Sequence, residues 1–213
     1  MKILWLLLFA FLPTLATAAA PAPVILVVGD SLSAGYGIAL RDAWPSLLQQ
    51  RLRKQGYPHT IANASISGDT SAGGRARLPD ALKRHRPEIV ILELGANDGL
   101  RGLSLGATRT NLESMIKTAQ TSGARVLLVG IHLPPNYGPA YTKKFHSIYL
   151  DLAQVHNLAL VPFLLDGVAL NPALMQPDGL HPRAVAQPRL LDNVWPKLLP
   201  LIKPSPPAAA HAK

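Results

Sequence analysis

Short apolar segments and longer helical stretches alternate along this chain of 213 residues. Residues 24–28 are all apolar and four of the five are β-branched, with Pro23 and Gly29 on either side. This pattern is typical of a strand buried in a parallel sheet. Similar runs predict four further strands, at 60–64, 89–94, 126–129 and 158–161. Helices are predicted between the strands and after the last one, over residues 44–52, 71–86, 112–119, 141–155 and 190–198.

The regular alternation of strands and helices determines the expected fold. Strands that are separated by helices pair in parallel, and right-handed crossovers place the helices on both faces of the sheet. We therefore predict an α/β protein with three layers, in which helices cover a five-stranded parallel sheet. The pattern shows no internal repeat, and residues 21–203 form the single predicted domain.

Both ends of the chain differ in composition from this domain. Met1 and Lys2 precede an apolar run at 3–15 and small residues at 16–20, which is the pattern of a secretory signal peptide. We therefore expect residues 1–20 to direct export to the periplasm or out of the cell. The apolar run is shorter than the ~20 residues of a spanning helix, so we expect no stable membrane anchor. Residues 204–213 are rich in Pro and Ala, which predicts a disordered tail.

The cysteine content and the net charge limit the kinds of site and of partner that we expect. The chain has no cysteine, which excludes disulfides, thiolate metal sites and a cysteine nucleophile. The formal net charge of +9 would suit nucleic acid or anionic lipid as a partner. No motif for nucleic-acid binding accompanies the charge, so we expect a solvated basic surface and no nucleic-acid partner.

Three polar turns follow three successive predicted strands. Ser31 comes after the first strand, Gly68 after the second and Asn97 after the third. Because all strands of a parallel sheet end at the same edge, these three turns should meet there. Asp178 and His181 lie in a late loop, and their spacing lets the carboxylate reach Nδ1 of the imidazole. The free Nε2 could then take a proton from a serine, as in a catalytic triad.

The motifs around these residues resemble the four sequence blocks of the SGNH hydrolases, also called GDSL esterases. They are Gly-Asp-Ser-Leu-Ser at 29–33, Ile-Ser-Gly-Asp-Thr-Ser at 66–71, Gly-Ala-Asn-Asp-Gly at 95–99 and Asp-Gly-Leu-His-Pro at 178–182. Leu-Pro-Pro-Asn-Tyr-Gly at 133–138 is similar to the exported thioesterase, arylesterase and lysophospholipase branch of the family. The resemblance covers residues 24–202 and implies a flavodoxin-like sheet. The chain departs from the family pattern at Ala96, where a second Gly is common.

The resemblance implies a role for each residue of these blocks. Ser31 would be the nucleophile, His181 the general base and then acid, and Asp178 the carboxylate that orients the imidazole. The oxyanion donors would be the backbone N–H groups of Ser31 and Gly68 and the side-chain amide of Asn97. We expect an acyl pocket between the loops at 100–105 and 132–137, with its substrate-binding residues at Leu100, Leu103, Leu133, Pro134 and Tyr137.

Several polar residues near these blocks have a simpler interpretation. Asp before Ser in a tight turn more often bonds the local backbone, so we assign that role to Asp30. We interpret Asp98 as a structural turn residue. Glu93 interrupts an apolar strand, and we expect it to be satisfied by a helix N-terminus or by a polar neighbour near the site. His132 would border the pocket without a catalytic role. The basic residues of 75–86 would form a solvated helix face.

The leading hypothesis is therefore a serine hydrolase that acts on small-molecule acyl esters and thioesters as a monomer and without a cofactor. Two alternatives remain: a carbohydrate O-deacetylase with the same site, and a non-catalytic binding module of the cell envelope. Asp178 and His181 could supply two metal ligands, but no third is evident, so we predict no metal site. The chain lacks the Gly-x-Ser-x-Gly elbow of the larger α/β-hydrolases and the glycine patterns of nucleotide-binding loops.

Overall fold

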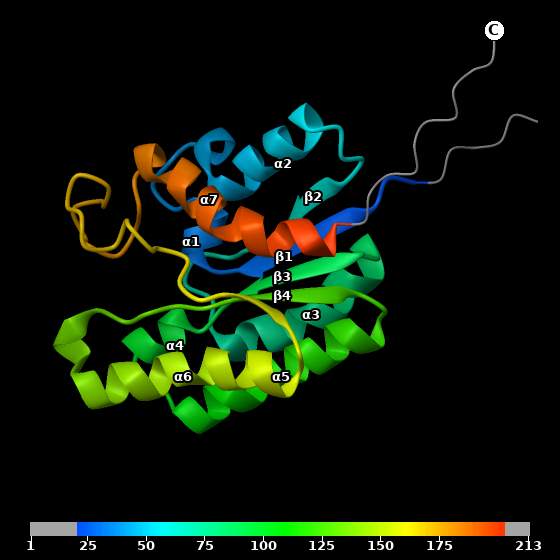
Figure 1. Cartoon of the computed structure of the whole chain (residues 1–213). Coiled ribbons are helices and arrows are strands. Elements are labelled where there is room, and N and C mark those ends of the chain that lie inside the picture. Colours follow the sequence, from blue (N-terminus) through cyan, green and yellow to red (C-terminus); the bar gives the residue numbers. More distant parts are fainter. Residues whose placement is uncertain (1–20, 203–213) are drawn as a thin grey trace, which may run out of the picture.

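The computed structural model describes residues 21–202, which surround a sheet of five parallel strands in the order β2-β1-β3-β4-β5 (Figure 1). The strands are β1 (Val24–Gly29), β2 (Thr60–Asn63), β3 (Ile89–Glu93), β4 (Arg125–Val129) and β5 (Ala159–Val161). All five predicted strands are confirmed. The predicted signal peptide at 1–20 and the predicted tail at 204–213 lie outside the described residues.

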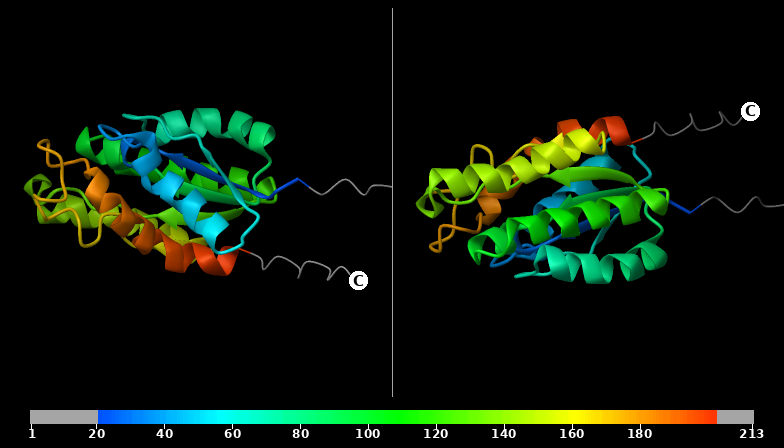
Figure 2. Two further views of the ribbon diagram at one scale, coloured as in Figure 1. Left: turned by 90° about the horizontal axis from the view of Figure 1, so that it is seen from above. Right: turned by 90° about the horizontal axis from the view of Figure 1, so that it is seen from below.

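Helices cover both faces of the sheet, as the two further views in Figure 2 show. The α-helices are α1 (Ser31–Ala34), α2 (Trp44–Lys54), α3 (Ser71–His85), α4 (Ala96–Leu100), α5 (Leu105–Thr121), α6 (Pro139–Val155) and α7 (Gln187–Leu198). Short 3₁₀ turns are η1 (Leu40–Asp42), η2 (Pro135–Tyr137), η3 (Ala184–Ala186) and η4 (Leu199–Leu201). Helices α2 and α7 pack on one face, and α3, α5 and α6 pack on the other, so the predicted three-layer fold is confirmed.

Alternate residues of the central strands build two separate cores. In β1, Ile25 and Val27 pack toward α2 and α7, whereas Leu26 and Val28 pack toward α3, α5 and α6. Because side chains of a strand point to opposite faces in turn, a strand covered on both sides must be apolar throughout. This is the physical reason for the unbroken apolar runs that predicted the sheet.

The helix boundaries differ from the predicted ones where the chain is polar. Helix α4 occupies a stretch that we expected to be a turn, and it starts directly after Gly95, whose φ of +117° ends the strand. Helix α5 begins well before its first fully buried leucine, because the Ser104 side chain caps it by accepting a hydrogen bond from Ala107 N. Helices α6 and α7 begin with a proline in the first turn, a position that proline favours. The sequence at these helix starts has little apolar periodicity, so the predicted helices began too late.

The strand order places β1 at the centre of the site-forming edge. The chain runs from β1 to β2 on one side and then crosses to β3 on the other, which creates a topological switch point beside β1. Ligands of open α/β sheets bind beyond the carboxyl ends of the strands at such a point. In Figure 1 this edge lies at the left, and the described chain ends lie at the opposite edge. Among residues 21–202, no helix is long and apolar enough to cross a bilayer.

Candidate active site

Ser31 stands at the carboxyl end of β1, in the first position of the one-turn helix α1. Asp30 caps this helix, because its Oδ1 accepts a hydrogen bond from Leu32 N at 3.0 Å. The predicted local role of Asp30 is therefore confirmed. Gly35 ends the helix in the left-handed conformation, with φ +79°. The sharp turn presents the Ser31 hydroxyl at the rim of the sheet.

His181 reaches Ser31 from the long loop between β5 and α7. The Nε2 atom of His181 lies 2.9 Å from Ser31 Oγ, and its Nδ1 lies 2.7 Å from Asp178 Oδ2. The other carboxylate oxygen, Oδ1, accepts hydrogen bonds from the backbone N–H groups of Leu180 and His181, at 2.9 and 3.0 Å. The structure thus brings together three residues that lie 150 positions apart at most. The Ser31 hydroxyl contacts the His181 imidazole, which in turn contacts the Asp178 carboxylate.

The loop that carries Asp178 and His181 is held by contacts within itself and with the turn after β1. The backbone N–H of Gln176 donates to His181 O at 2.7 Å, and the Gln176 side chain donates to Tyr36 O at 2.8 Å. The Tyr36 ring lies against the His181 ring, with their centroids 4.4 Å apart. These contacts restrict the imidazole, which a loop residue needs in order to keep a fixed geometry.

The pKa of Asp178 reflects its position between protein and water. Partial burial acts to raise this pKa, but the hydrogen bonds from the His181 ring and from the backbone N–H groups of His181 and Leu180 outweigh burial and lower it. The carboxylate is therefore ionised at neutral pH. An ionised carboxylate on Nδ1 keeps the proton there and leaves Nε2 free to accept one.

Asn97, in α4, lies beside Asp30. Its Nδ2 donates to Asp69 O at 2.9 Å and to Asp30 Oδ2 at 3.2 Å. Gly68 directly precedes Asp69 in the turn after β2, with φ +79°, which only glycine adopts readily. Its carbonyl oxygen accepts a hydrogen bond from Arg101 Nη2 at 2.9 Å. The three polar turns predicted to meet at one edge are thus linked by hydrogen bonds.

A buried pair of carboxyl groups lies directly beneath the Ser31 turn. Glu93, at the end of β3, is fully buried, and its Oε2 accepts hydrogen bonds from Ser33 Oγ at 2.7 Å and from Asp30 N at 3.4 Å. Glu93 therefore faces a polar neighbour near the site, and the expectation that a helix N-terminus satisfies it is wrong. A Cβ at Gly29 would lie only 2.6 Å from Glu93 Oε2, which explains the glycine there.

Burial governs the protonation of this pair. It raises the pKa of Asp30 to about 7, against the lowering effect of the hydrogen bonds from Leu32 and Asn97. Burial, together with the charge of Asp30, raises the pKa of Glu93 well above its usual value. Both shifts favour the protonated form of these carboxyl groups, because burial penalises a negative charge and a second charge nearby adds to that penalty. Asp30 meanwhile accepts the hydrogen bonds from Leu32 and Asn97.

Asp98 and Arg77 hold the neighbouring turn. Asp98 accepts hydrogen bonds from Ser71 N at 2.8 Å and from Ser71 Oγ at 2.5 Å, so it anchors the start of α3 and is structural, as predicted. Arg77 corrects the prediction of a solvated basic face. Its guanidinium donates to Asp69 Oδ2 at 2.7 Å, to Ala64 O and to Gly29 O at 3.2 Å. The long Arg77 side chain therefore ties α3 to the ends of β1 and β2, because its guanidinium reaches carbonyl groups at both.

A cavity of about 1050 Å³ opens beside Ser31, Asn97 and His181. Three of the five predicted substrate-binding residues line it, namely Leu100, Leu133 and Pro134. The other two do not. Leu103 is exposed, and the Tyr137 hydroxyl donates to Leu100 O at 3.0 Å, which holds that ring outside the lining.

Sequence reasoning missed the opposite wall of this cavity. The loop after β5 contributes it, with apolar residues that interrupt an otherwise polar and irregular stretch, namely Phe163, Leu165, Ala169, Leu170 and Met175. Apolar residues without periodicity after a strand were the available signal. His132 borders the cavity as predicted, with its ring stacked 3.6 Å from that of His146, and burial lowers its pKa.

Other histidines have acidic partners that their sequence spacing did not reveal. His59 is buried, and its Nε2 lies 3.2 Å from Glu88 Oε2, between the start of β2 and the start of β3. This pair lies at the amino ends of the strands, on the edge away from Ser31. Within residues 21–202, no three histidine, aspartate or glutamate side chains form a group that could hold a metal ion.

Comparison with known proteins identifies relatives of the whole described domain. The model of the GDSL-like lipase/acylhydrolase family matches residues 27–187. The chain is 53% identical to Esterase TesA of Pseudomonas aeruginosa, over 88% of this chain and 94% of that protein. It is 44% identical to Thioesterase 1/protease 1/lysophospholipase L1 of Escherichia coli K12, over 93% of this chain and 94% of that protein.

Solved structures agree with this relationship. The crystal structure of TesA superimposes with a TM-score of 0.82 at 53% identity, covering 84% of this chain and 99% of that one. The psychrotrophic esterase EstA from Pseudoalteromonas, inhibited by monoethylphosphonate, superimposes with a TM-score of 0.80 at 40% identity, covering 83% and 97%. The resemblance first seen in four short motifs extends over the fold, and the chain belongs to the GDSL-like lipase/acylhydrolase family.

Proposed function

We propose that this family member hydrolyses acyl esters and thioesters with Ser31 as the nucleophile, His181 as the general base and Asp178 as the orienting carboxylate. The observation that carries the proposal is the chain of two hydrogen bonds, 2.9 Å from Ser31 Oγ to Nε2 and 2.7 Å from Nδ1 to Asp178. A serine hydroxyl is a weak nucleophile unless a base takes its proton, and this geometry supplies that base.

The reaction proceeds in two halves through an acyl-enzyme. Ser31 Oγ attacks the carbonyl carbon while its proton moves to His181 Nε2, and the carbonyl oxygen becomes an oxyanion. Collapse of this intermediate breaks the bond to the alcohol or thiol, which takes the proton from Nε2 as it leaves. Water then attacks the acyl-enzyme with the same base, and Ser31 regains its proton as the free acid departs.

Three donors would stabilise the oxyanion: the backbone N–H groups of Ser31 and Gly68, and the Asn97 amide. Neither of the two backbone N–H groups donates to an acceptor within residues 21–202. Both N–H groups of the Asn97 amide are donated in the structure, to Asp69 O at 2.9 Å and to Asp30 Oδ2 at 3.2 Å, so the longer bond to Asp30 would be exchanged for one to the oxyanion while the bond to Asp69 keeps the amide in place. Donors fixed before the reaction contribute most to rate in sites of this kind.

The cavity favours an acyl substrate of some length over an acetyl group. Its volume of about 1050 Å³ and its apolar walls, which include Leu100, Leu133 and Phe163, exceed what a two-carbon acyl group could fill. Esters, thioesters and lysophospholipids all present such chains, and the names of the relatives cover these classes. This argues against the carbohydrate O-deacetylase and against a non-catalytic module.

The composition of residues 1–20 supports a proposal about where the enzyme acts. We infer that residues 1–20 direct export to the periplasm and that residues 21–203 act as one monomeric catalytic domain. The pattern of a short basic start, an apolar run and small residues at 16–20 supports the export signal. Mass determination of the mature protein recovered from a periplasmic fraction would test it, and an intact residue 1 would contradict it.

Labelling with a fluorophosphonate ester tests the mechanism directly. The reagent should add to Ser31, as located by peptide mass spectrometry, and Ser31→Ala should lose both the adduct and ester hydrolysis. Ser147 lines the same cavity without a basic partner, so Ser147→Ala is the matched control and should keep both. An adduct at any other residue would contradict the proposal.

Chain-length preference tests the substrate class. The protein is assayed with p-nitrophenyl acetate, octanoate and decanoate, and with an acyl-CoA of medium length. We expect the longer esters and the thioester to be preferred in kcat/KM. A site that cleaves acetate and rejects octanoate would favour the deacetylase instead.

A further inference from the structure

Large apolar side chains are exposed mainly at one edge of this molecule. Eleven of them are exposed in the described chain, and eight of these lie between the carboxyl end of a strand and the next long helix. We call these eight the apolar rim: Tyr36, Leu40, Ile66, Leu103, Tyr137, Leu170, Leu180 and Val185. Because all strands are parallel, segments after their carboxyl ends share one edge, which is the edge of Ser31. Figure 1 shows these loops together at the left end of the sheet.

The exposure of these side chains is large. Leu40 is 70% exposed, Val185 is 68% exposed and Leu170 is 89% exposed. Single exposed apolar residues need no explanation, but their collection at the mouth of a cavity is typical of an interaction surface. Leu170 and Leu180 belong both to the rim and to the cavity lining, so the rim is continuous with the proposed acyl pocket.

Cations without acidic partners lie at the same edge. Among residues 21–202, Arg101, Lys143, Lys144 and Arg183 form no ion pair with a carboxylate. Three carboxylates of these loops are paired with cations, Asp42 with Arg41, Asp69 with Arg77 and Asp166 with Arg189, whereas Asp178 contacts the His181 imidazole and keeps its negative charge. The edge therefore combines exposed apolar side chains with an excess of positive charge.

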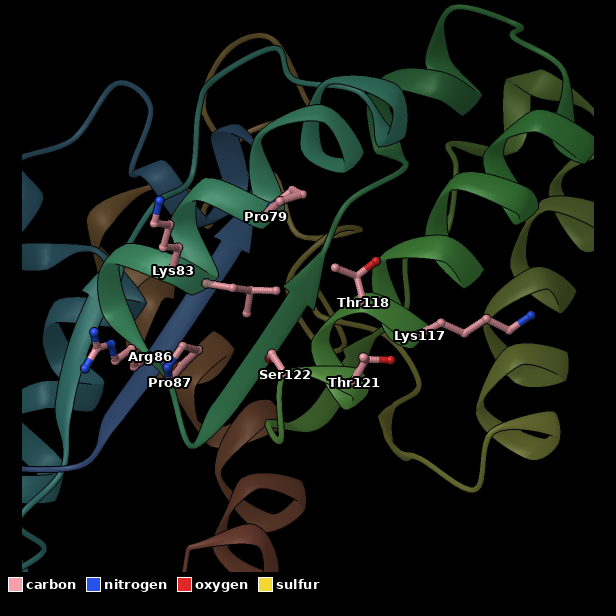
Figure 3. Close-up of a pocket in the computed structure, with 9 residues that line it drawn as sticks. Pro79, Lys83, Arg86, Pro87, Lys117, Thr118, Thr121 and Ser122 are labelled. Atoms are coloured by element: carbon pink, nitrogen blue, oxygen red, sulfur yellow. The ribbon is translucent and has the colours of Figure 1, made fainter.

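The opposite edge of the sheet has charge without such a rim. A groove of about 750 Å³ between α3 and α5 is bordered there by Lys83, Arg86 and Lys117 (Figure 3). In that view the three cationic side chains extend outward in different directions, so they do not converge on one ligand. The two exposed large apolar residues toward that edge are Val155, at the end of α6, and Leu199, after α7.

We propose that the edge around Ser31 is a docking surface for anionic lipid, with the apolar rim inserted among the acyl chains and the four unpaired cations at the headgroups. Surface-bound proteins combine apolar insertion with attraction to anionic headgroups in this way. Docking places the mouth of the cavity against the lipid, so an acyl chain enters along Leu170 and Leu180 without crossing water. The inference rests on the proposed function for its substrate class, but the binding itself does not depend on catalysis.

Vesicle sedimentation tests the docking surface. The Ser31→Ala protein is used, so that the lipid is not cleaved, with vesicles of phosphatidylcholine alone or mixed with phosphatidylglycerol. We expect binding to the anionic vesicles that is at least about tenfold tighter than to the neutral ones. Added salt should weaken it, because the cations act at an exposed surface.

Matched variants locate the surface. Leu40→Ser, Ile66→Ser and Val185→Ser combined remove rim residues that do not line the cavity, and they should lower vesicle affinity about tenfold or more. Val155→Ser with Leu199→Ser is the apolar control at the other edge and should have no effect. Lys144→Gln with Arg183→Gln should reduce the preference for anionic vesicles, whereas Lys83→Gln with Lys117→Gln should not. Circular dichroism and thermal unfolding check that each variant folds.

Two results would overturn the docking surface. One is equal binding to neutral and anionic vesicles, or none to either. The other is an equal loss of affinity in the rim variant and in the control at the opposite edge. Hydrolysis of a soluble ester by the wild-type protein tests the proposed function separately, so failure of one is distinguishable from failure of the other.

Discussion

Two aspartates lie near Ser31, the proposed nucleophile, and their surroundings give them opposite properties. Asp178 lies in the loop above Ser31 with 39% of its side chain exposed, and hydrogen bonds from His181 and Leu180 lower its pKa. Asp30 directly precedes Ser31, is fully buried, and its pKa is raised to about 7 by that burial. The same residue type thus serves as an ionised partner of an imidazole in one region and as part of a buried carboxyl pair with raised pKa values in the other.

The comparison shows that the loop above Ser31 and the buried region beneath it have different tasks. The loop region contacts Ser31 through the His181 imidazole, which takes up a proton in the proposed mechanism. The buried region shapes the turn: Asp30 caps α1 and holds Asn97, and Glu93 bonds Ser33 beneath it. Substitutions in the loop should therefore affect turnover with little change in stability, and substitutions beneath the turn should affect stability first.

The largest expected effect is that of Asp178→Asn. An amide in place of the carboxylate no longer stabilises the protonated ring and favours the wrong tautomer, so kcat should fall about 10³–10⁴-fold. The free energy of unfolding should change little, because the side chain is partly exposed. Steady-state kinetics and urea unfolding measure the two quantities. Asp166→Asn, in the same loop and exposed, is the control and should retain normal turnover.

Asn97→Ala links the two regions, because the residue is held by Asp30 but is proposed to act as an oxyanion donor. Loss of one oxyanion donor should reduce kcat roughly 10²–10³-fold while KM stays close to its normal value. The control is Asn136→Ala, in the exposed turn η2. A decrease of less than about threefold in kcat would show that Asn97 is not a donor to the transition state.

Gly29→Ala tests the buried region by steric conflict. The added methyl group would meet Glu93 Oε2 at 2.6 Å and Ser33 Cβ at 2.8 Å, so we expect a loss of about 1–3 kcal/mol in the free energy of unfolding. Gly106→Ala, in the first turn of α5, meets only Ser104 Oγ at 3.7 Å. It should be neutral or slightly stabilising, because alanine favours helices. Equal effects of the two substitutions in urea unfolding would contradict the close packing around Glu93.

The smallest expected effect concerns pH. The folded state raises the pKa values of Asp30 and Glu93 above their ordinary values, so it binds protons more tightly than the unfolded chain does. Their contribution to stability is present below the unfolded pKa values of 3.8 and 4.5, and it is lost as pH rises through the folded pKa values, which is about 7 for Asp30.

Glu93→Gln should make this loss of stability with pH shallower, by on the order of 1 kcal/mol between about pH 5 and pH 8. The substitution removes one titrating carboxyl, which would otherwise gain a negative charge beside Asp30 as the pH rises. Urea unfolding at a series of pH values measures the slope. Glu113→Gln, on the exposed surface of α5, is the control and should leave the slope unchanged over this range. An unchanged slope in Glu93→Gln would mean that the buried pair does not titrate there.

Several features of the fold and site were open to prediction because they depend on local patterns. Unbroken apolar runs predicted the five strands, since a strand buried on both faces has no polar position. The polar turns at Ser31, Gly68 and Asn97 could be assigned to one edge because parallel strands end together. The Asp-x-x-His spacing placed the carboxylate of Asp178 within reach of His181. Each of these inferences needs only the geometry of one element or one short loop.

Other features depend on contacts between distant segments. No sequence pattern showed that Glu93 lies under Ser33, that Arg77 reaches the end of β1, or that Phe163 completes the cavity wall. The mouth of the cavity is likewise formed by loops that follow different strands, so the apolar rim becomes visible only when exposure is known for each side chain.

The sequence by itself determined the layered sheet, the family and the identity of the residues proposed to react with substrate. These properties depend on hydrophobic periodicity and on short motifs, whose physical basis is the local geometry of strands and turns. Only the tertiary structure decided which carboxylate is ionised, which carboxyl groups are buried with raised pKa values, and which surface exposes apolar side chains. Protonation and exposure are set by burial, and burial is a property of the whole packed chain.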